Sequence, residues 1–528
     1  MSGHRSMTVS DRSRRRATWA LVAWSTFFTA RPINAGGSPI GAEVQEPLGG
    51  FSRYHTACPN YVHYSASLHY PFSDGPLKLP FQRPSPHCRT FSSPVVEKVI
   101  EDVTSRMVDK DLARLFENAF PNTLDTTVRW HDDGTGAGKK RKSHHGQDDG
   151  DKWAGPQSFI VTGDIDAEWL RDSTNQLAGY HRLARQDKKI EKLILGAINT
   201  QAEYVIESPY CNAFQPPPRS GLPYTTNGQP DNVHPMYEPS FVFECKYELD
   251  SLAHFLALGN QFHEHTGSTA FLNARWHAAL TTLLQVLENQ SRPTFDPKTG
   301  LFQRNEYTFE RGTSTGTETL VLGGNGNPLK EGTGLIRSAF RPSDDSTILG
   351  FFIPANAMLA VELKRTADVL AKAGGKSSLS KALRTRGEEL QKAVWEHGVV
   401  STTKWGEVFA YEVDGYGSHI LMDDANVPSL LSLPLLGFVD ASNPTYQNTR
   451  KMILSRDGNP YYLEGRDFRG IGGPHIGLQN AWPMSVLLQT MTSTSDEEIM
   501  ENLHLVRNAS RLGLIHESIH VQNLQSYT

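Results

Sequence analysis

Apolar residues recur at three- and four-residue spacing along most of the chain after about residue 94, as on one face of an amphipathic helix. This spacing predicts helices over residues 95–120, 167–183, 190–206, 246–265, 270–287, 345–363, 379–395, 424–436, 444–454, 478–491 and 497–512. Strand-like segments are short and lie between them, at residues 158–162, 301–304 and 408–411. The chain has no repeat of about 30–45 residues, so the pattern favours an all-α toroid of paired helices, with short strands in its loops, over a solenoid.

The amino terminus has the features of a secretory signal. A basic cluster at residues 12–16 precedes an apolar run at residues 17–30, and small residues follow up to Ala35. The run spans only about 21 Å as a helix, less than the ~30 Å hydrocarbon core of a bilayer. We therefore expect residues 1–35 to be a signal, with a short signal anchor as the alternative. The protein is then expected to be secreted or to enter the lumen of the Golgi or vacuole.

The rest of the chain divides into an arm and one large domain. Residues 36–93 are rich in Pro, Ser, His and Tyr with little periodicity, which predicts an extended arm. Residues 94–528 carry the helical pattern and form the large domain. Within it, residues 134–152 are charged and of low complexity, which is typical of a mobile surface insertion. Their Lys-Lys-Arg-Lys run also resembles a nuclear localisation signal, but the secretory signal favours a solvated loop.

Composition and charge limit the class of protein. The 528 residues include 52 basic and 57 acidic side chains, a net charge of −5, and 38% of them are hydrophobic. Such a chain is globular, and it lacks the basic excess that nucleic-acid binding requires. No second apolar run approaches a membrane span, which excludes a polytopic membrane protein. We expect a monomer that contacts a membrane, if at all, only through an amino-terminal anchor.

The secretory compartment makes the four cysteines candidates for disulfide bonds. Two local bridges, Cys58–Cys88 and Cys211–Cys245, are the simplest of the three pairings that four cysteines allow. Other pairings and free thiols remain open, and no CxxC spacing supports a structural zinc site. Glycosylation sequons that fit the same compartment begin at Asn289 and Asn508.

Several loops between the predicted helices combine aromatic, acidic, arginine and glycine residues. They lie at residues 163–173, 338–346, 411–416, 462–466 and 472–477. Such loops at one end of a rigid scaffold are where binding sites usually lie. Aromatic faces stack on pyranose rings, and carboxylate and guanidinium groups hydrogen-bond to vicinal hydroxyls. The loops therefore indicate a carbohydrate site, where one protonated and one ionised carboxyl group would cleave a glycosidic bond.

Three short segments are candidates for this chemistry. Asp344 and Asp345 are adjacent, and one of two buried neighbouring carboxyl groups can stay protonated near neutral pH. The alternative is that they cap a helix beginning near Thr347. Glu517 stands in a His-Glu-Ser triplet, a pattern that is otherwise typical of an exposed surface. The Trp-Leu-Arg-Asp segment at residues 169–172 is better explained by a ligand than by a surface turn.

Other kinds of site find little support in the sequence. His475 and His516 lack the HxxxH spacing of a zinc site, and Asp423 and Asp424 lack the alternating acids of a calcium loop. Motifs for a nucleophilic serine or cysteine, for a dinucleotide and for a phosphate-binding loop are also missing. We therefore expect neither a metal ion nor a cofactor.

Five long blocks carry a resemblance to a known family. They are TGDIDAEWLRDSTNQ (162–176), YELDSLAHFL (247–256), SAFRPSDDSTILGFFIPANAM (338–358), YEVDGYGSHILMDDANVPSLL (411–431) and GIGGPHIGLQNAWPMS (470–485). On these blocks the chain resembles glycoside hydrolase family 125, the exo-α-1,6-mannosidases, and within it the fungal members known as meiotically up-regulated proteins. The resemblance implies an (α/α)6 barrel. It also implies an inverting enzyme that removes terminal α-1,6-linked mannose from oligosaccharides or glycans.

The resemblance also implies roles for particular residues. Asp344 resembles the general acid, with Asp345 as the second choice, and Glu517 resembles the general base that activates water. Arg171 and Asp172 are expected to hold hydroxyl groups of the terminal mannose. The other residues expected to line the pocket are Asp164, Trp169, Arg341, Asp345, Glu464, His475, Trp482 and His516. In an inverting enzyme the two catalytic carboxyl groups lie roughly 6.5–9.5 Å apart, which leaves room for the water.

The carboxyl end departs from the family pattern. After the His-Glu-Ser triplet, family members continue with an acidic stretch and a helix rich in Trp and Phe, whereas residues 519–528 here read IHVQNLQSYT. We therefore expect the last barrel helix to be missing, which would expose an apolar flank and weaken the support of Glu517. A catalytically inactive mannan-binding or scaffolding protein is the resulting alternative to an enzyme.

Overall fold

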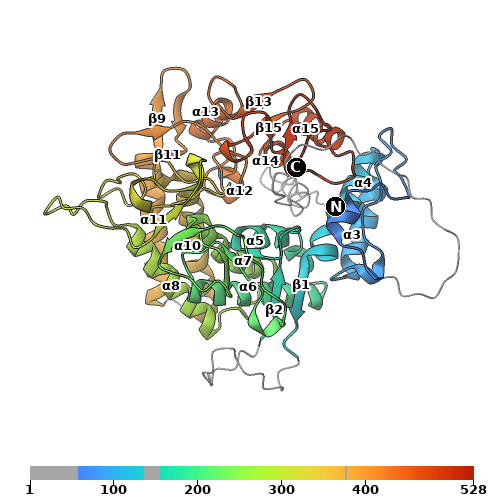
Figure 1. Cartoon of the computed structure of the whole chain (residues 1–528), viewed down its shortest axis with the longest axis horizontal. Coiled ribbons are helices and arrows are strands. Elements are labelled where there is room, and N and C mark those ends of the chain that lie inside the picture. The colour runs from blue at the N-terminus through green and yellow to red at the C-terminus, as the bar shows by residue number, and fades with distance from the viewer. Residues whose placement is uncertain (1–56, 136–154, 375–376) are drawn as a thin grey trace, which may run out of the picture.

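Helices that follow one another around a ring are the main elements of the computed structural model, which describes residues 57–135, 155–374 and 377–528 (Figure 1). The predicted signal and most of the predicted insertion lie outside these residues. The longer helices are α3 (Pro94–Arg106), α4 (Lys110–Ala119), α5 (Leu170–Ala178), α6 (Lys188–Glu207), α7 (Leu249–Thr266), α8 (Ala274–Gln290), α10 (Ile353–Gly374), α11 (Ser378–Gly398), α13 (Pro444–Ile453), α14 (Pro483–Met491) and α15 (Asp496–Ala509). Shorter ones are α2 (Tyr61–Ser65), α9 (Val321–Gly324) and α12 (Leu433–Leu436).

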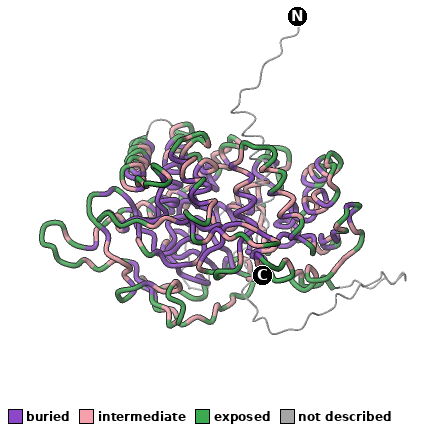
Figure 2. Tube along the Cα trace, turned by 90° about the horizontal axis from the view of Figure 1, so that it is seen from above, coloured by how far each residue is buried: buried purple, intermediate pink, exposed green. Residues whose placement is uncertain are grey.

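The helices pack in two layers. α7 and α10 contact each other and are buried along most of their length, and α5 also packs on α7. α11 packs on α10 from outside and buries a single stripe that includes Leu383, Leu390 and Val394. α8 likewise packs on α6 and buries one face. Figure 2 shows the result, with buried residues gathered in the interior and exposed residues on the outer turns and loops.

Short antiparallel strands connect the helices. Their bounds are β1 (Val128–Asp132), β2 (Gln157–Ile160), β3 (Glu168–Trp169), β4 (Ala213–Phe214), β5 (Asp231–His234), β6 (Val242–Glu244), β7 (Thr308–Arg311), β8 (Phe351–Phe352), β9 (Val399–Thr402), β10 (Gly406–Phe409), β11 (Glu412–Val413), β12 (His419–Ile420), β13 (Tyr462–Glu464), β14 (Arg469–Ile471), β15 (Asn480–Ala481) and β16 (Ile519–His520). The sheets join β1 to β2, β3 to β4 to β6, β5 to β7, β8 to β11 to β12, β9 to β10, β13 to β14 and β15 to β16.

Some predicted elements differ from the structure. The helix predicted over residues 95–120 is broken into α3 and α4, because Asp109 caps α4 through the N–H groups of Asp111 and Leu112, both at 3.0 Å. The helix predicted over residues 345–363 begins only at Ile353.

The helix predicted over residues 424–436 is reduced to α12. Asp423 accepts the N–H groups of Leu430 and Leu431 at 2.8 and 2.9 Å and so folds this stretch into a loop. The strand predicted over residues 301–304 is only an isolated bridge between Phe302 and Phe295.

The ring closes where α15 meets α4, the red and blue ends of the colour scale in Figure 1. Asp109 forms an ion pair with Arg507, and Asn118 Nδ2 donates to the carbonyl of Gly513 at 2.8 Å. An apolar cluster lies between the two ends of the chain and includes Leu79, Leu115, Val486, Val506, Ile515 and Ile519. The contact therefore buries apolar side chains from both ends of the chain.

The described part of the predicted arm, residues 57–93, packs against the ring. Its Arg83 lies between two carboxylates, 2.7 Å from Asp125 and 2.6 Å from Glu97. A disulfide joins Cys58 to Cys88 within the arm. The segment lacks long regular elements but is fixed by these contacts.

The second disulfide joins Cys211 to Cys245, both of which are buried. Among the sequons, Asn289 is half-buried near the end of α8 and Asn508 is exposed near the end of α15. Within residues 57–135, 155–374 and 377–528, no helix combines the length and the apolar character that crossing a bilayer requires.

Candidate active site

The two adjacent aspartates lie in a tight turn. Arg341 donates its N–H to the carbonyl of Asp345 at 2.8 Å, and Asp344 donates its N–H to the carbonyl of Arg341 at 3.0 Å. Asp344 has a φ of 71°, in the left-handed region that residues other than glycine rarely occupy. Since α10 begins only at Ile353, the alternative that these aspartates cap a helix is wrong.

The turn is anchored by a buried ion pair between Arg341 and Glu412 of β11. Arg341 Nε lies 2.6 Å from Glu412 Oε1, and the two side chains are 1% and 0% exposed. The other oxygen, Oε2, accepts the N–H groups of Ile348 and Leu349, both at 2.9 Å. One carboxylate therefore fixes the segment on both sides of the aspartates.

Asp344 faces a group of charged residues at the starts of α5 and α7, centred on Arg171. Arg171 Nη1 lies 2.5 Å from Glu248 Oε2 and 3.6 Å from Asp250 Oδ2. Arg171 Nε lies 3.4 Å from Asp172 Oδ2. The structure thus brings together the Arg-Asp pair of the Trp-Leu-Arg-Asp segment and the first aspartate of the turn.

Several carboxylate oxygens in this group accept no hydrogen bond from the described residues. They are Asp172 Oδ2, both side-chain oxygens of Asp250, and Asp344 Oδ1. An unsatisfied buried acceptor is costly unless a ligand or water donates to it. These oxygens are themselves buried, whereas the side chains of Asp172 and Asp344 as a whole are 18% and 22% exposed and so are partly open to solvent. The arrangement suits a molecule that donates several hydrogen bonds.

The two aspartates of the turn have pKa values shifted in opposite directions. Burial alone would raise the pKa of Asp344, but Lys246, 3.6 Å from its Oδ1, and Arg171 outweigh burial and lower it. Asp345 is 1% exposed, and burial, reinforced by Asp424, raises its pKa to about 6. Asp345 therefore holds its proton to a higher pH than its neighbour.

Asp345 belongs to a second group of residues, in the loops before α14. Its Oδ2 accepts the N–H of His475 at 3.0 Å. Two residues earlier, a Cβ on Gly473 would stand 2.8 Å from the Trp482 ring and 3.6 Å from Asp424 Oδ2. Only glycine allows the loop to approach Trp482 so closely, and this approach brings His475 to the aspartate turn.

Glu517 is connected to this second group through the pairing of β15 with β16. Ala481 pairs with Ile519, so Glu517 lies two residues before the paired position, in the segment that leads into β16. Glu517 is 9% exposed, and the alternative that it stands in an exposed surface triplet is therefore wrong.

The residues after β16 fold back over the His-Glu-Ser triplet. Glu517 donates its N–H to the carbonyl of Thr528 at 2.9 Å. Tyr527 stacks on His516, with ring centroids 3.7 Å apart, and burial lowers the pKa of His516 to about 4. This segment therefore supports the loop that carries Glu517.

For three predicted pocket residues, the structure shows burial and, for two of them, contacts outside these two groups. Glu464 is exposed at the end of β13 and lies 3.4 Å from Arg456. Asp164 is exposed in the loop before β3. Trp169 is 7% exposed and packs edge-on against Phe243. Their contact with a ligand stays a prediction.

Sequence patterns miss several residues that the fold brings to the site. The YELD segment (247–250) contains Glu248 and Asp250, and the YEVD segment (411–414) contains Glu412. The acidic and aromatic composition of these segments is the only sequence feature that points to a functional role for the three residues. The only signal at Asp424 is that the Asp423-Asp424 pair weakly resembles part of a calcium loop, and no sequence pattern marks Lys246. Their roles depend on neighbours that are distant in the chain.

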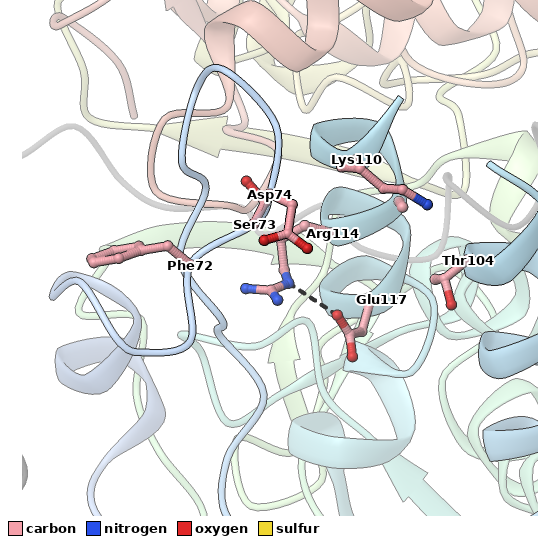
Figure 3. A pocket seen from close by; sticks show the side chains of 8 residues that line it. Phe72, Ser73, Asp74, Thr104, Lys110, Arg114 and Glu117 are labelled. Atoms are coloured by element: carbon pink, nitrogen blue, oxygen red, sulfur yellow. Dashed lines mark hydrogen bonds and ion pairs between the residues drawn. The ribbon is translucent and has the colours of Figure 1, made fainter. Parts of the chain in front are cut away.

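A pocket between the arm and helices α3 and α4 is separate from this site (Figure 3). It is lined by Phe72, Ser73, Asp74, Thr104, Lys110, Ala113, Arg114 and Glu117. Arg114 donates to Glu117 at 2.9 Å and to the carbonyl of Leu79 at 3.3 Å. These bonds hold the arm on α4, which favours a structural role.

Glu168 lies directly before Trp169 and is fully buried. Its Oε2 accepts the N–H of Ile160 at 3.0 Å, and its Oε1 has no hydrogen-bond partner among the described residues. Burial raises the pKa of Glu168 to about 8. The folded protein therefore keeps this side chain largely protonated at neutral pH.

Comparisons with known proteins show which proteins the whole chain is similar to. A family model described as metal-independent alpha-mannosidase (GH125) matches residues 109–528. The meiotically up-regulated gene 157 protein of Schizosaccharomyces pombe is 54% identical over 473 residues, which cover 89% of either chain. A solved α-mannosidase from Streptococcus pneumoniae, in a non-productive complex with α-1,6-mannobiose, matches with a TM-score of 0.72 and 29% identity. That match covers 83% of this chain and 95% of the other, and it confirms the predicted (α/α)6 barrel.

Replacing Glu412 by Gln removes the charge that pairs with the buried Arg341. We expect the free energy of unfolding to fall by about 3 kcal/mol, because the arginine is left without its counter-charge. Urea titration followed by circular dichroism measures this loss. Glu464→Gln, in an exposed ion pair, is the matched control and should cost less than about 0.5 kcal/mol. Equal losses in the two variants would contradict the anchoring role.

Replacing Glu168 by Gln should flatten the dependence of stability on pH. The folded pKa of about 8 lies above the ordinary value of 4.5, so unfolding releases a proton between these pH values. Wild-type stability therefore falls relative to Glu168→Gln by about 1.4 kcal/mol per pH unit from pH 4.5 to 8, and the difference levels off above pH 8. Urea titrations from pH 5 to 9 measure the difference. A constant difference would show that Glu168 is ionised in the folded protein.

Proposed function

Because the chain belongs to the GH125 family of metal-independent α-mannosidases, we propose that it removes terminal α-1,6-linked mannose from glycans by an inverting mechanism. As a family member it is a glycoside hydrolase that acts on mannose-containing glycans. The α-1,6 linkage is supported by the α-1,6-mannobiose bound to the S. pneumoniae relative, one of a family of α-mannosidases described for the processing of N-linked glycans.

One observation from the structure carries this proposal. Carboxylate oxygens of Asp172, Asp250 and Asp344 have no hydrogen-bond donor among the described residues, and they lie around Arg171. A mannose ring presents hydroxyl groups that donate to such oxygens and accept from a guanidinium group. The group around Arg171 is therefore the proposed site of the terminal mannose.

We assign the general acid to Asp344 and keep Asp345 as the second candidate. The side chain of Asp344 is 22% exposed, whereas Asp345 is 1% exposed and its Oδ2 accepts the N–H of His475. A general acid must reach the glycosidic oxygen, which favours the accessible residue. Lys246 holds the pKa of Asp344 low in the free protein, so the protonated form requires an acidic medium or desolvation by the bound sugar.

Glu517 is the proposed general base. It takes a proton from the water that attacks the anomeric carbon, while Asp344 gives its proton to the departing oxygen of the cleaved bond. Attack on the face opposite the leaving group yields β-mannose and a glycan shortened by one residue. The two carboxyl groups carry out both proton transfers, as an inverting mechanism requires.

The compartment of this reaction is the secretory pathway in our proposal, either outside the cell or in the Golgi or vacuolar lumen. The disulfides Cys58–Cys88 and Cys211–Cys245 support an oxidising compartment. An acidic lumen would also favour the protonated form of Asp344.

Asp344→Asn and Glu517→Gln should each reduce the turnover of α-1,6-mannobiose by about 10²–10⁴-fold, because each removes one proton transfer. Binding of mannobiose, measured by calorimetry, should be retained. Asp345→Asn tests the second candidate, and Asp102→Asn, in an exposed ion pair, is the control. A larger loss in Asp345→Asn than in Asp344→Asn would transfer the acid role to Asp345.

The product anomer tests the mechanism separately. Proton NMR of the first turnover should show β-mannose, which then mutarotates. Initial release of α-mannose would contradict inversion. Binding without hydrolysis by the wild-type protein would instead support the alternative, a mannan-binding or scaffolding protein.

A further inference from the structure

A row of alternating charges leads from the sheet of β5 and β7 to Asp344. Arg311 lies 2.7 and 2.8 Å from the two carboxylate oxygens of Asp231 and 2.9 Å from Glu244 Oε1. Lys246 Nζ lies 3.5 Å from the same oxygen of Glu244 and 3.6 Å from Asp344 Oδ1. Acidic and basic side chains therefore alternate through five residues, and the row ends at the proposed acid.

The fold holds this row rigidly. Asp231 stands opposite Arg311 in the register of β5 and β7, and Glu244 ends β6. The disulfide of Cys245 fixes the next position, and the N–H of Lys246 donates to Asn212 Oδ1 at 3.0 Å. These contacts therefore fix the backbone from which the Lys246 side chain extends.

Burial strengthens the electrostatic interactions between the charges of this row. The side chains of Asp231, Arg311, Glu244 and Lys246 are 1%, 6%, 9% and 5% exposed. Charges that water does not screen interact more strongly than charges on the surface. The charge of Lys246 therefore acts on Asp344 with little loss.

We propose that Lys246 is a positioning residue for the acid Asp344, and that the row behind it sets the pH range over which Asp344 donates its proton. This inference rests on the proposed role of Asp344. Glu244 has a closer partner in Arg311, at 2.9 Å, so neutralising Glu244 does not by itself require Lys246. Lys246 is also the one described cation within 4.0 Å of Asp344.

Other charged groups also face Asp344. They are Arg171 and Asp172 of α5, Glu248 before α7, Arg311 of β7 and His475 in the loop before β15. Burial raises the pKa of Asp344, and Lys246 is the largest of the influences that lower it. Loss of the lysine charge should therefore leave Asp344 protonated to a higher pH.

The test is the pH profile of kcat/KM on α-1,6-mannobiose for Lys246→Met. The alkaline limb should move up by about one pH unit, because the acid keeps its proton longer. Turnover at the optimum should fall about tenfold with little change in KM, because the carboxyl group is no longer held in place. Lys246→Arg should restore the wild-type limb. Lys404→Met removes an exposed lysine that pairs with Asp457, and it should change neither quantity.

The other possible results of this experiment each support or overturn the proposed role of Lys246. A folded Lys246→Met protein whose alkaline limb stays in place, or moves down, would overturn it. If Lys246→Met melts below the assay temperature, Lys246→Gln, which can hydrogen-bond to both carboxylates, takes its place with the same expected shift. If Asp344→Asn retains activity, Asp344 is not the acid, and the inference is overturned together with that assignment while the hydrolase activity itself stands. If the wild-type protein binds mannobiose without hydrolysis, the pH dependence of binding is measured by calorimetry. An upward shift of that dependence in Lys246→Met supports the inference, and no shift overturns it.

Discussion

The buried ion pair between Arg341 and Glu412 is the interaction on which the site depends. Removing two charges from water is costly, and here the cost is offset because Glu412 also accepts two backbone N–H groups beyond the turn. Asp344 occupies a left-handed backbone conformation that a free segment would abandon. The ion pair lets this strained conformation persist and so fixes the directions of the two aspartates.

Because of this turn, the side chains of the adjacent residues Asp344 and Asp345 face different parts of the molecule. Asp344 faces Arg171 and Lys246, from the first half of the chain, and Asp345 faces His475 and Asp424, from the last quarter. Their pKa values shift in opposite directions for this reason. The turn therefore joins residues from both halves of the ring, so the complete group of residues forms only when the ring is closed.

Helical spacing predicts much of this fold, because most ring helices bury a regular face. The helical spacing is misleading at residues 345–363. Apolar residues continue the spacing there, but residues 345–352 are held by contacts with Glu412 and with neighbouring loops, and the helix begins only after them. Residue type identifies the aspartate pair and the Trp-Leu-Arg-Asp segment. It cannot identify Lys246 or the surroundings of Glu517, because these depend on the Cys211–Cys245 disulfide and on the pairing of β15 with β16.

The charge balance around Arg171 argues for a sugar independently of family membership. Arg171 and Lys246 face the carboxyl groups of Asp172, Glu248, Asp250 and Asp344, and Arg171 is already engaged by Glu248 at 2.5 Å. A phosphate or other anion placed there would meet carboxylate oxygens and be repelled. A neutral polyol avoids this repulsion, since its hydroxyl groups can donate to carboxylate oxygens that accept no hydrogen bond from the described residues and can accept from the guanidinium group. This arrangement of charges therefore supports the proposed binding of a sugar.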